Sequence, residues 1–252
     1  MPSASPTTST VSDAQYQAVV ERQDELVRLK ARAQQKKSML LFGPEGVGKT
    51  RLLRAFAANE PLALYVGKPS SPHELLMAML DAMKQSGRRG LSLPANYKSH
   101  RSTSLKGIVL RLLDEHPFLL LVDHLAGPSR VVTGLIKEMN YYERTPVIFA
   151  ARTPHMEDIG TLLPMCADRS ERLELKNFSL PLALAFAQRA AEETGLTASN
   201  LAEALAFVVE RCEGNPGGVL TMVRMAQMPL YRTGDQIKSH VLYLDYRMGR
   251  RS

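Results

Sequence analysis

Tryptophan is absent from the 252 residues, cysteine occurs only twice, and no run of 18 apolar residues is present. The last absence argues against a membrane-spanning helix, so we expect no membrane partner. Cys166 and Cys212 lack the spacing of a metal-binding cluster, which predicts free thiols in a cytoplasmic protein. The first residues lack the basic and apolar segments of a signal peptide, and residues 1–14 are predicted to form a disordered polar tail.

Negative charge is the scarcer sign, because 25 Asp and Glu residues stand against 32 Lys and Arg residues, a formal net charge of +7. The excess is concentrated in residues 84–106, which contain six basic and no acidic side chains. These six are Lys84, Arg88, Arg89, Lys98, Arg101 and Lys106. Such an excess can serve nucleic acid, an acidic partner or solubility alone.

Short apolar runs alternate with helical patterns over the first two thirds of the chain. Strands are expected at residues 38–42, 62–66, 118–122, 146–151 and 172–178. Helices are expected at residues 12–35, 50–58, 71–84, 105–115 and 129–142, with a capping box of Ser71 and Glu74 opening the third of them. Strands that are apolar throughout and alternate with helices predict an α/β fold with a parallel sheet flanked by helices.

The pattern becomes entirely helical after residue 178. Three helical stretches are expected at residues 180–195, 198–214 and 217–228. We therefore predict an α/β core at 15–177, a small all-helical lid domain at 178–228 and a basic C-terminal tail at 229–252. The tail is expected to dock on the core or on a partner, since it contains several apolar residues.

A glycine-rich turn lies between the first predicted strand and the following helix. Its sequence matches the phosphate-binding pattern G-x-x-x-x-G-K-[ST] and consists of Gly43, Pro44, Glu45, Gly46, Val47, Gly48, Lys49 and Thr50. The glycines allow backbone N–H groups to turn inward around an anion, and the helix N-terminus adds a positive dipole. Lys49 is expected to reach the β- and γ-phosphates of ATP, and the Thr50 hydroxyl to ligate Mg²⁺. We include the next residue, Arg51, among the nucleotide-binding candidates.

Two later strands are expected to bring further polar residues to the same edge of the sheet. Asp123 follows the strand at 118–122 and is a candidate to hold Mg²⁺ through a water molecule. His124 follows it and has two interpretations: it orients an attacking water, or it is structural and hydrolysis is slow. Arg152 ends the strand at 146–151, where it could contact the γ-phosphate, although a surface arginine is the alternative.

These residues together resemble AAA+/STAND-type P-loop ATPases, in particular the origin-recognition-like branch and the transposition-regulator ATPases. The resemblance covers about residues 15–228 and includes "VERQDELVRL" before the P-loop, "FGPEGVGKT", "LLLVDH", "VIFAART" and "CEGNPGG". It implies that Arg22 and Pro216 lie near the adenine. Two positions depart from the family: His124 replaces an acidic residue, which argues for weak hydrolysis, and Gly217 stands where several relatives have arginine.

The resemblance also raises the question of oligomers. An arginine finger for a neighbouring subunit could come from Arg169 or Arg172, while a solvated charge run is the alternative interpretation. We expect either a homo-oligomer or a separate effector protein, because the chain ends soon after the predicted lid.

Three functions are compatible with this sequence. The first is a nucleotide-dependent switch that assembles on double-stranded DNA, with Arg88, Arg89, Lys98, Arg101 and Lys106 binding phosphates and Tyr97 among them. The second is a signalling or scaffolding switch that is read by a protein partner, in which case the basic loop is only solvated. The third, a small-molecule kinase, ranks last because the predicted lid has few arginines.

Overall fold

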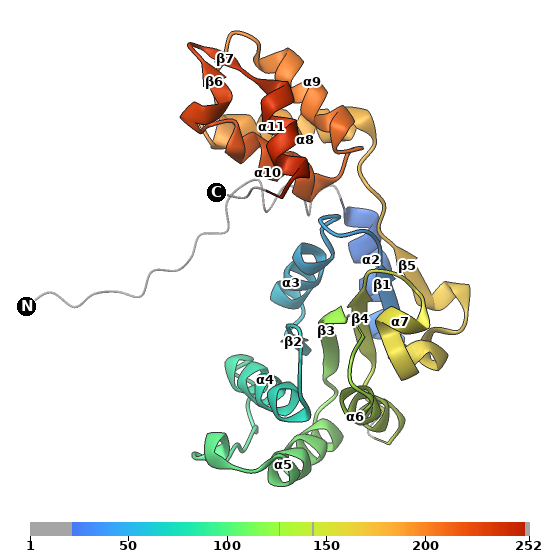
Figure 1. Cartoon of the computed structure of the whole chain (residues 1–252). Helices are drawn as coiled ribbons and strands as arrows, with labels where there is room; N and C mark the ends of the chain where they lie inside the picture. Colours follow the sequence, from blue (N-terminus) through green and yellow to red (C-terminus); the bar gives the residue numbers. More distant parts are fainter. Residues whose placement is uncertain (1–21, 126, 143, 250–252) are drawn as a thin grey trace, which may run out of the picture. The chain divides into compact units, whose positions relative to one another are not determined.

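The computed structural model describes residues 22–125, 127–142 and 144–249 (Figure 1). The described chain divides into two compact units, an α/β unit at Arg22–Lys176 and a helical unit that begins at Asn177. The predicted tail at 1–14 and the helix start near residue 12 lie outside the described residues. Within the described ranges, no helix is both long enough and apolar enough to span a membrane.

The α/β unit is built on a parallel sheet of five strands, as the sequence predicts. The strands are β1 (Met39–Phe42), β2 (Ala63–Val66), β3 (Leu119–Leu125), β4 (Val147–Ala151) and β5 (Arg172–Glu174). Their order is β2-β3-β4-β1-β5, and each neighbouring pair is parallel. The carboxyl ends of β1, β3 and β4 therefore meet at one edge of the sheet, which is where ligands bind in open α/β sheets.

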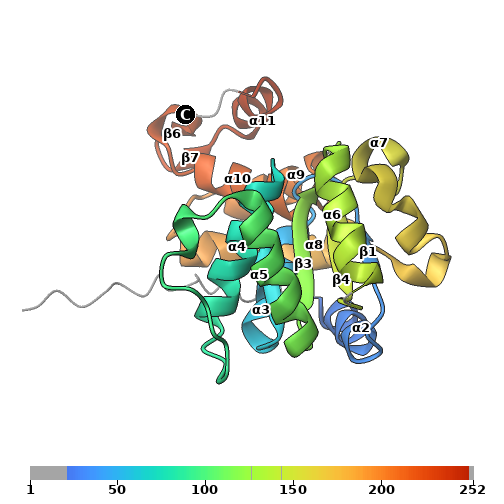
Figure 2. The ribbon, with the colours of Figure 1, turned by 90° about the horizontal axis from the view of Figure 1, so that it is seen from below.

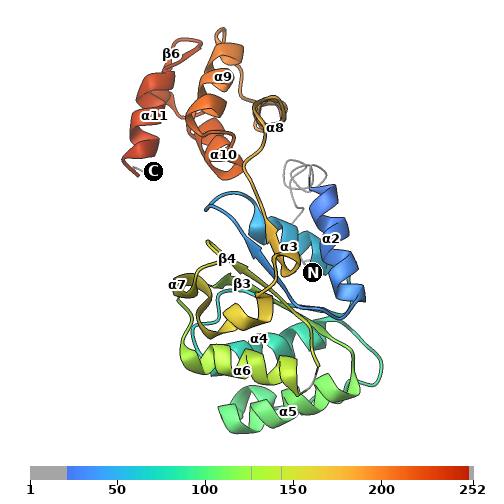
Figure 3. The same cartoon turned by 90° about the vertical axis from the view of Figure 1, so that its right-hand side faces the viewer.

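Helices cover both faces of this sheet (Figures 2 and 3). They are α2 (Gln23–Gln34), α3 (Lys49–Asn59), α4 (Pro72–Gln85), α5 (Ser102–Glu115), α6 (Arg130–Tyr141) and the short α7 (Met156–Ile159). Leu40 of β1 packs in the cluster formed with α4, α5 and α6, while Met39 and Leu41 pack with α2 and α3. Because successive strand residues point to opposite faces, strands buried on both sides must be apolar throughout.

The N-terminal ends of α4 and α5 differ from the prediction, the first in its capping bonds and the second in its starting residue. Ser71 caps α4 by accepting a hydrogen bond from the Glu74 backbone N–H (3.2 Å). The other half of the predicted capping box is not made with Ser71, because the Glu74 carboxylate accepts from the backbone N–H (2.9 Å) and hydroxyl of Ser70. Helix α5 starts at Ser102, three residues before the predicted start, and a 3-10 turn, η1 (Tyr97–Ser99), lies in the preceding loop.

The helical unit contains the three predicted helices and a further substructure. The helices are α8 (Leu180–Glu193), α9 (Leu201–Arg211) and α10 (Pro216–Met225). They are followed by η4 (Pro229–Tyr231), the antiparallel strands β6 (Arg232–Thr233) and β7 (Gln236–Ile237), and α11 (Ser239–Arg247). Tyr231, Ile237 and Leu242 are buried in the same core as the three helices. Residues 229–249, separated above as a basic tail, therefore fold as part of this unit.

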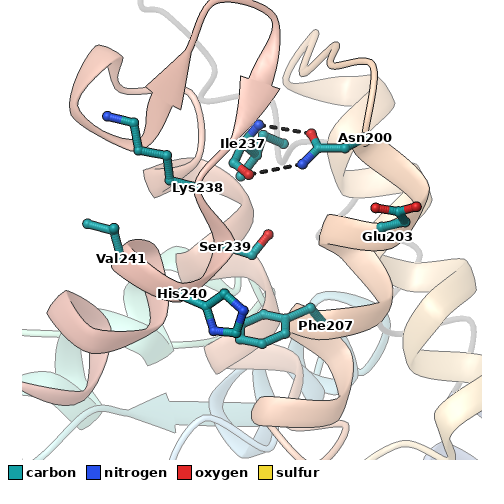
Figure 4. A pocket seen from close by; sticks show the side chains of 8 residues that line it. All are labelled: Asn200, Glu203, Phe207, Ile237, Lys238, Ser239, His240 and Val241. Carbon is teal, nitrogen blue, oxygen red and sulfur yellow. Dashed lines mark hydrogen bonds between the residues drawn. The ribbon is translucent and has the colours of Figure 1, made fainter.

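An open groove of about 470 Å³ lies in the helical unit between α9 and the segment from β7 to α11 (Figure 4). The Asn200 side chain joins its two walls, since it donates to the Ile237 carbonyl (3.0 Å) and accepts from the Ile237 N–H (2.9 Å). The lining residues are Asn200, Glu203, Phe207, Ile237, Lys238, Ser239, His240 and Val241. None of them belongs to the P-loop.

Both cysteines are free thiols, as expected, and both are buried. Burial raises the pKa of Cys212 to about 11 and also raises the pKa of Cys166. These thiols are therefore poor nucleophiles and poor metal ligands at neutral pH.

Candidate nucleotide-binding site

The P-loop connects β1 to α3 and adopts backbone angles that favour glycine. Gly43, Gly46 and Gly48 have φ values of +151°, +78° and +105°. The Gly43 N–H donates to the Arg152 carbonyl (3.2 Å), and a Cβ added at Gly43 would lie within 3.0 Å of the Leu175 carbonyl oxygen. The loop is thus held by β4 on one side and by the end of β5 on the other. Gly48 precedes α3 and leaves its first N–H groups without a side-chain cap, which is the arrangement that binds anions.

Lys49 folds back over this loop. Its ammonium donates to the carbonyl oxygens of Gly43 (2.7 Å) and Pro44 (2.9 Å). Burial lowers the pKa of Lys49, the carboxylates of Asp123 and Glu45 partly oppose that shift, and Arg152 adds to it. The charges of Asp123, Glu45 and Arg152 therefore all act on the Lys49 ammonium.

Asp123 ends the regular part of β3 and is almost completely buried, with 1 % of its surface exposed. Its Oδ2 accepts a hydrogen bond from the Tyr65 hydroxyl (2.8 Å), and its Oδ1 accepts from the His124 N–H (2.8 Å). Arg54 on α3 in turn donates to the Tyr65 hydroxyl (3.4 Å). Burial, and next the bond to Asp123, raise the pKa of Tyr65.

Sequence reasoning missed Tyr65 and Arg54. Tyr65 is opposite Leu121 in the parallel pairing of β2 with β3. Leu121 precedes Asp123 by two residues on the same strand. The only available signal was a hydroxyl-bearing side chain in an otherwise aliphatic strand. Its partner becomes visible only when the register of the two strands is known.

His124 lies next to the P-loop because the strand is irregular at this point. The pairing of β3 with β4 shifts register between Val122 and Leu125, and His124 has a left-handed φ of +55°. Its Nε2 is 3.0 Å from the Thr50 Oγ1 and 3.5 Å from the Asp123 Oδ2. The structure therefore brings the His124 imidazole close to both Thr50 and Asp123, the two residues expected to bind the metal ion.

Arg152 follows β4, the strand between β1 and β3, and its side chain is exposed. The next residue, Thr153, donates through its N–H (2.8 Å) and hydroxyl (2.6 Å) to the Asp158 carboxylate of α7. This pair fixes the backbone that carries Arg152, at the edge of the sheet where the P-loop lies.

Arg22 is buried against the P-loop, and its place near the adenine stays a prediction. It is 8 % exposed, and its guanidinium donates to the carbonyl oxygens of Val47 (3.3 Å) and Lys176 (2.6 Å) and to the Glu25 carboxylate (2.9 Å). Arg22 thus braces the P-loop backbone. Arg51, also a candidate, is half-buried in the first turn of α3.

Pro216 is the one nucleotide-binding candidate in the helical unit. It is buried at the first position of α10. The preceding Asn215 side chain caps this helix by accepting from the Gly218 N–H (3.0 Å). A buried proline in this position starts the helix.

The basic segment is partly neutralised by acidic residues from neighbouring helices. Lys98 lies 3.7 Å from the Asp81 carboxylate, and Lys106 lies 2.7 Å from that of Glu138. The suggestion that Tyr97 takes part in binding DNA is wrong, because the ring is buried and its hydroxyl donates to Asp81 (2.6 Å).

The remaining arginines of this segment differ in exposure. Arg88 is half-buried over the Phe118 ring, 5.9 Å from its centroid. Arg89 and Arg101 are exposed. These two side chains are therefore the strongest candidates for contact with a phosphate backbone.

The two candidates for an arginine finger also differ. Arg172 begins β5 and donates to the carbonyl oxygens of Cys166 (2.8 Å) and Ala167 (3.3 Å). Its guanidinium is therefore hydrogen-bonded to the backbone of its own chain. Arg169 lies in η3 (Arg169–Glu171) and is exposed. Of the two, Arg169 is the one that could reach a neighbouring molecule.

The donor set fits a divalent cation that is shared with a nucleotide. Within the described ranges, no group of three His, Cys, Asp or Glu residues could hold a metal ion by itself. A site made by one hydroxyl and one carboxylate needs phosphate oxygens and water to complete it, which is how Mg²⁺ is usually bound with nucleotides. Thr50 and Asp123 are the residues that would hold it.

Known structures share this fold. A Walker-type ATPase of Pyrococcus abyssi matches with a TM-score of 0.63 and 17 % identity over 91 % of this chain and 72 % of that chain. The Orc1 protein of Aeropyrum pernix, solved in complex with DNA, matches with a TM-score of 0.60 and 15 % identity over 91 % of this chain and 65 % of that chain. The RuvB Holliday junction branch migration motor of Thermotoga maritima matches with a TM-score of 0.54 and 16 % identity, over 91 % and 68 % of the two chains.

A weaker similarity is found in sequence. The replication factor C large subunit of Aeropyrum pernix is 27 % identical over 189 residues, which is 74 % of this chain but only 34 % of that protein. The chain thus spans about a third of the length of this curated relative. No family model matches the chain. The fold is that of the AAA+-type P-loop ATPases, and the resemblance predicted from the sequence is confirmed at that level.

Proposed function

We propose that this protein is an ATP-dependent switch that binds ATP with Mg²⁺ and hydrolyses it slowly. The observation that carries the proposal is the arrangement of Lys49, Thr50, Asp123 and His124 at one edge of the sheet. The first three are the groups that hold a nucleotide and its metal ion in P-loop proteins. The fourth stands where an acidic residue would orient water.

Each residue has a role that follows from its contacts. The Lys49 ammonium already donates two hydrogen bonds to loop carbonyls, and a phosphate is a stronger acceptor for the same protons. Thr50 and Asp123 would hold Mg²⁺, which neutralises phosphate charge. Arg152, exposed after β4, would contact a terminal phosphate and respond to its loss.

His124 supplies the reason for slow hydrolysis. Its Nε2 is already within hydrogen-bond distance of the Thr50 hydroxyl (3.0 Å), so that nitrogen is not free to orient a water. A carboxylate at the same position would offer more acceptor sites and a negative charge. General-base assistance typically contributes about 10² to 10⁴ in rate, and we expect most of that factor to be missing.

The first experiment measures binding and turnover separately. Affinity for a fluorescent ATP analogue should fall at least about tenfold in Lys49→Ala, since a charge-assisted contact to phosphate is worth about 1.5–3 kcal/mol. Lys137→Ala, an exposed lysine on α6, is the matched control and should bind normally. In single-turnover assays, His124→Glu should hydrolyse ATP at least about tenfold faster than the unchanged protein. Equal binding by Lys49→Ala would refute the nucleotide site, and rapid hydrolysis by the unchanged protein would refute the slow switch.

The finer proposal is that the ATP-bound form assembles on double-stranded DNA. It is supported by the exposed Arg89 and Arg101 and by similarity in fold to an Orc1 protein whose solved complex contains DNA. Fluorescence anisotropy with duplex DNA, at several salt concentrations, should show affinity that falls steeply as salt rises. Removing both arginines should lower the slope of log K against log salt by about two, because each phosphate contact contributes about one. The double variant Lys30→Ala/Lys137→Ala loses the same charge and should leave the slope nearly unchanged.

A switch that is read by a protein partner is the alternative outcome of this assay. It is favoured if ATP binds while DNA is ignored at low salt. Light scattering in the same nucleotide states reports assembly, and an assembly that depends on Arg169 but survives Arg89→Ala would place the neighbouring subunit at η3.

A further inference from the structure

His124 adopts an unfavourable backbone conformation that places its side chain beside the P-loop. A φ of +55° is uncommon for a residue that is not glycine, and it coincides with the register shift of β3. In a regular strand, His124 and Asp123 would point to opposite faces of the sheet. Instead, the His124 Nε2 lies 3.5 Å from the Asp123 Oδ2. An outlier of this kind at a binding site is a reason to ask what the side chain does there.

The distance between two potential ligands, the Thr50 hydroxyl and the His124 ring, matches the edge of a metal coordination sphere. Two atoms that each lie about 2.1 Å from an ion, at right angles, are about 3.0 Å apart. The Thr50 Oγ1 and His124 Nε2 are 3.0 Å apart, and the Asp123 Oδ2 lies slightly farther from the same nitrogen. The nitrogen thus lies about one octahedral edge from the Thr50 hydroxyl. Without a metal ion the two side chains share a hydrogen bond, which coordination of both atoms to one ion would replace.

We propose that His124 is a direct metal ligand and that the nucleotide site prefers a first-row transition-metal ion over Mg²⁺. This inference rests on the proposed nucleotide function. Mg²⁺ is a hard ion that takes oxygen ligands, whereas an imidazole nitrogen suits ions such as Fe²⁺, Co²⁺ and Zn²⁺. With the acidic residue replaced by histidine, the protein offers a nitrogen, a hydroxyl and a carboxylate. The first of these ligands selects against Mg²⁺.

The first test compares affinities without measuring turnover. Untagged protein at pH 8 is titrated with a fluorescent ATP analogue in the presence of either Mg²⁺ or Co²⁺, and the ratio of the two dissociation constants is taken. We expect Co²⁺ to give at least tenfold tighter binding in the unchanged protein. His124→Glu should bring the ratio close to one, because it replaces the nitrogen by oxygen. His155→Gln, which removes an exposed histidine that follows β4, should keep the full preference.

The second test detects the ligand directly. Electron spin-echo measurements on Mn²⁺ with the ATP analogue, in protein that contains ¹⁵N-labelled histidine, should show a nitrogen coupling that disappears in His124→Glu and persists in His155→Gln. Nucleotide binding with equal affinities for both ions, or a spectrum without nitrogen coupling, would overturn the metal assignment and leave the ATP switch intact. If no metal ion supports nucleotide binding, the proposed function itself fails.

Discussion

Gly43→Ala tests how closely the P-loop is packed against the end of β5. Gly43 has a φ of +151°, and a Cβ at this position would fall within 3.0 Å of the Leu175 carbonyl oxygen. That oxygen cannot move away easily, because the Leu175 N–H is bonded to the Phe42 carbonyl (2.7 Å). The methyl group must therefore displace backbone on one side of the contact.

The expected loss of stability has two parts. Forcing an additional methyl group into a packed contact costs about 1–3 kcal/mol. An L-residue held in a glycine-only backbone region costs about a further 1–3 kcal/mol. Taking about 4 kcal/mol in total, and about 2–4 °C per kcal/mol for a unit of this size, the unfolding midpoint should fall by about 8–16 °C. Thermal unfolding followed by circular dichroism, without nucleotide, measures it.

Gly48→Ala separates the two parts. Gly48 also has a positive φ (+105°), but a Cβ there would meet nothing within 4 Å. It should lose only the backbone part and unfold at a temperature at least about 2–4 °C above that of Gly43→Ala. Equal midpoints for the two variants, or a higher midpoint for Gly43→Ala, would refute the close approach between the P-loop and β5.

Three further predictions concern the side chains that support the site. Arg22→Met should lower the unfolding midpoint by about 4–8 °C, at about 2 kcal/mol for lost charge-assisted bonds, and weaken ATP binding in the same fluorescence assay; normal values for both would show that Arg22 does not brace the loop. Tyr65→Phe should weaken binding of the Mg²⁺–ATP analogue several-fold in calorimetry, because the buried Asp123 carboxylate loses a donor. The bond to Asp81, and next burial, raise the pKa of Tyr97 to about 12, so its stabilisation is present below pH 10 and is lost as the pH rises from 10 to about 12. Tyr97→Phe should be about 1–2 kcal/mol less stable at pH 9, and the difference in absorbance at 295 nm between the unchanged protein and this variant should appear near pH 12. A difference that appears near pH 10 would contradict the bond.

The strands and most helices could be predicted because their signals are local. An apolar run of four or five residues between helical patterns is sufficient to identify β1 or β4, and the P-loop has a fixed spacing. The C-terminal substructure could not be recognised in the same way. The strands β6 and β7 contain two residues each, and only one residue of α11, Leu242, is buried. The other apolar residues of α11, such as Val241 and Leu244, are exposed, so its apolar positions do not mark one buried face.

Within the site, the motif residues could be predicted and their supporting contacts could not. Lys49, Asp123 and Arg152 follow strands whose carboxyl ends must meet in a parallel sheet. The bond between Tyr65 and Asp123 depends on the register of two strands separated by about fifty residues of chain. The position of the His124 ring depends on a strand irregularity that no residue pattern announces. Charge counting along the sequence also overestimated the basic segment, because Asp81 and Glu138 approach it from other helices.

The backbone of the connection between the two units is fixed on both of its sides. In the α/β unit, the Lys176 carbonyl accepts from the Arg22 guanidinium (2.6 Å). In the helical unit, the Asn177 side-chain oxygen accepts from the Asn215 side-chain amide (3.1 Å), and the Phe178 N–H donates to the Gly214 carbonyl (3.1 Å). The Arg22 guanidinium donates both to the Lys176 carbonyl and to the Val47 carbonyl of the P-loop. A change in the P-loop backbone and a change at residue 176 therefore both involve the Arg22 side chain. For that reason we expect Arg22→Met to perturb both the P-loop and the backbone at residue 176, although no sequence motif connects Arg22 with Lys176.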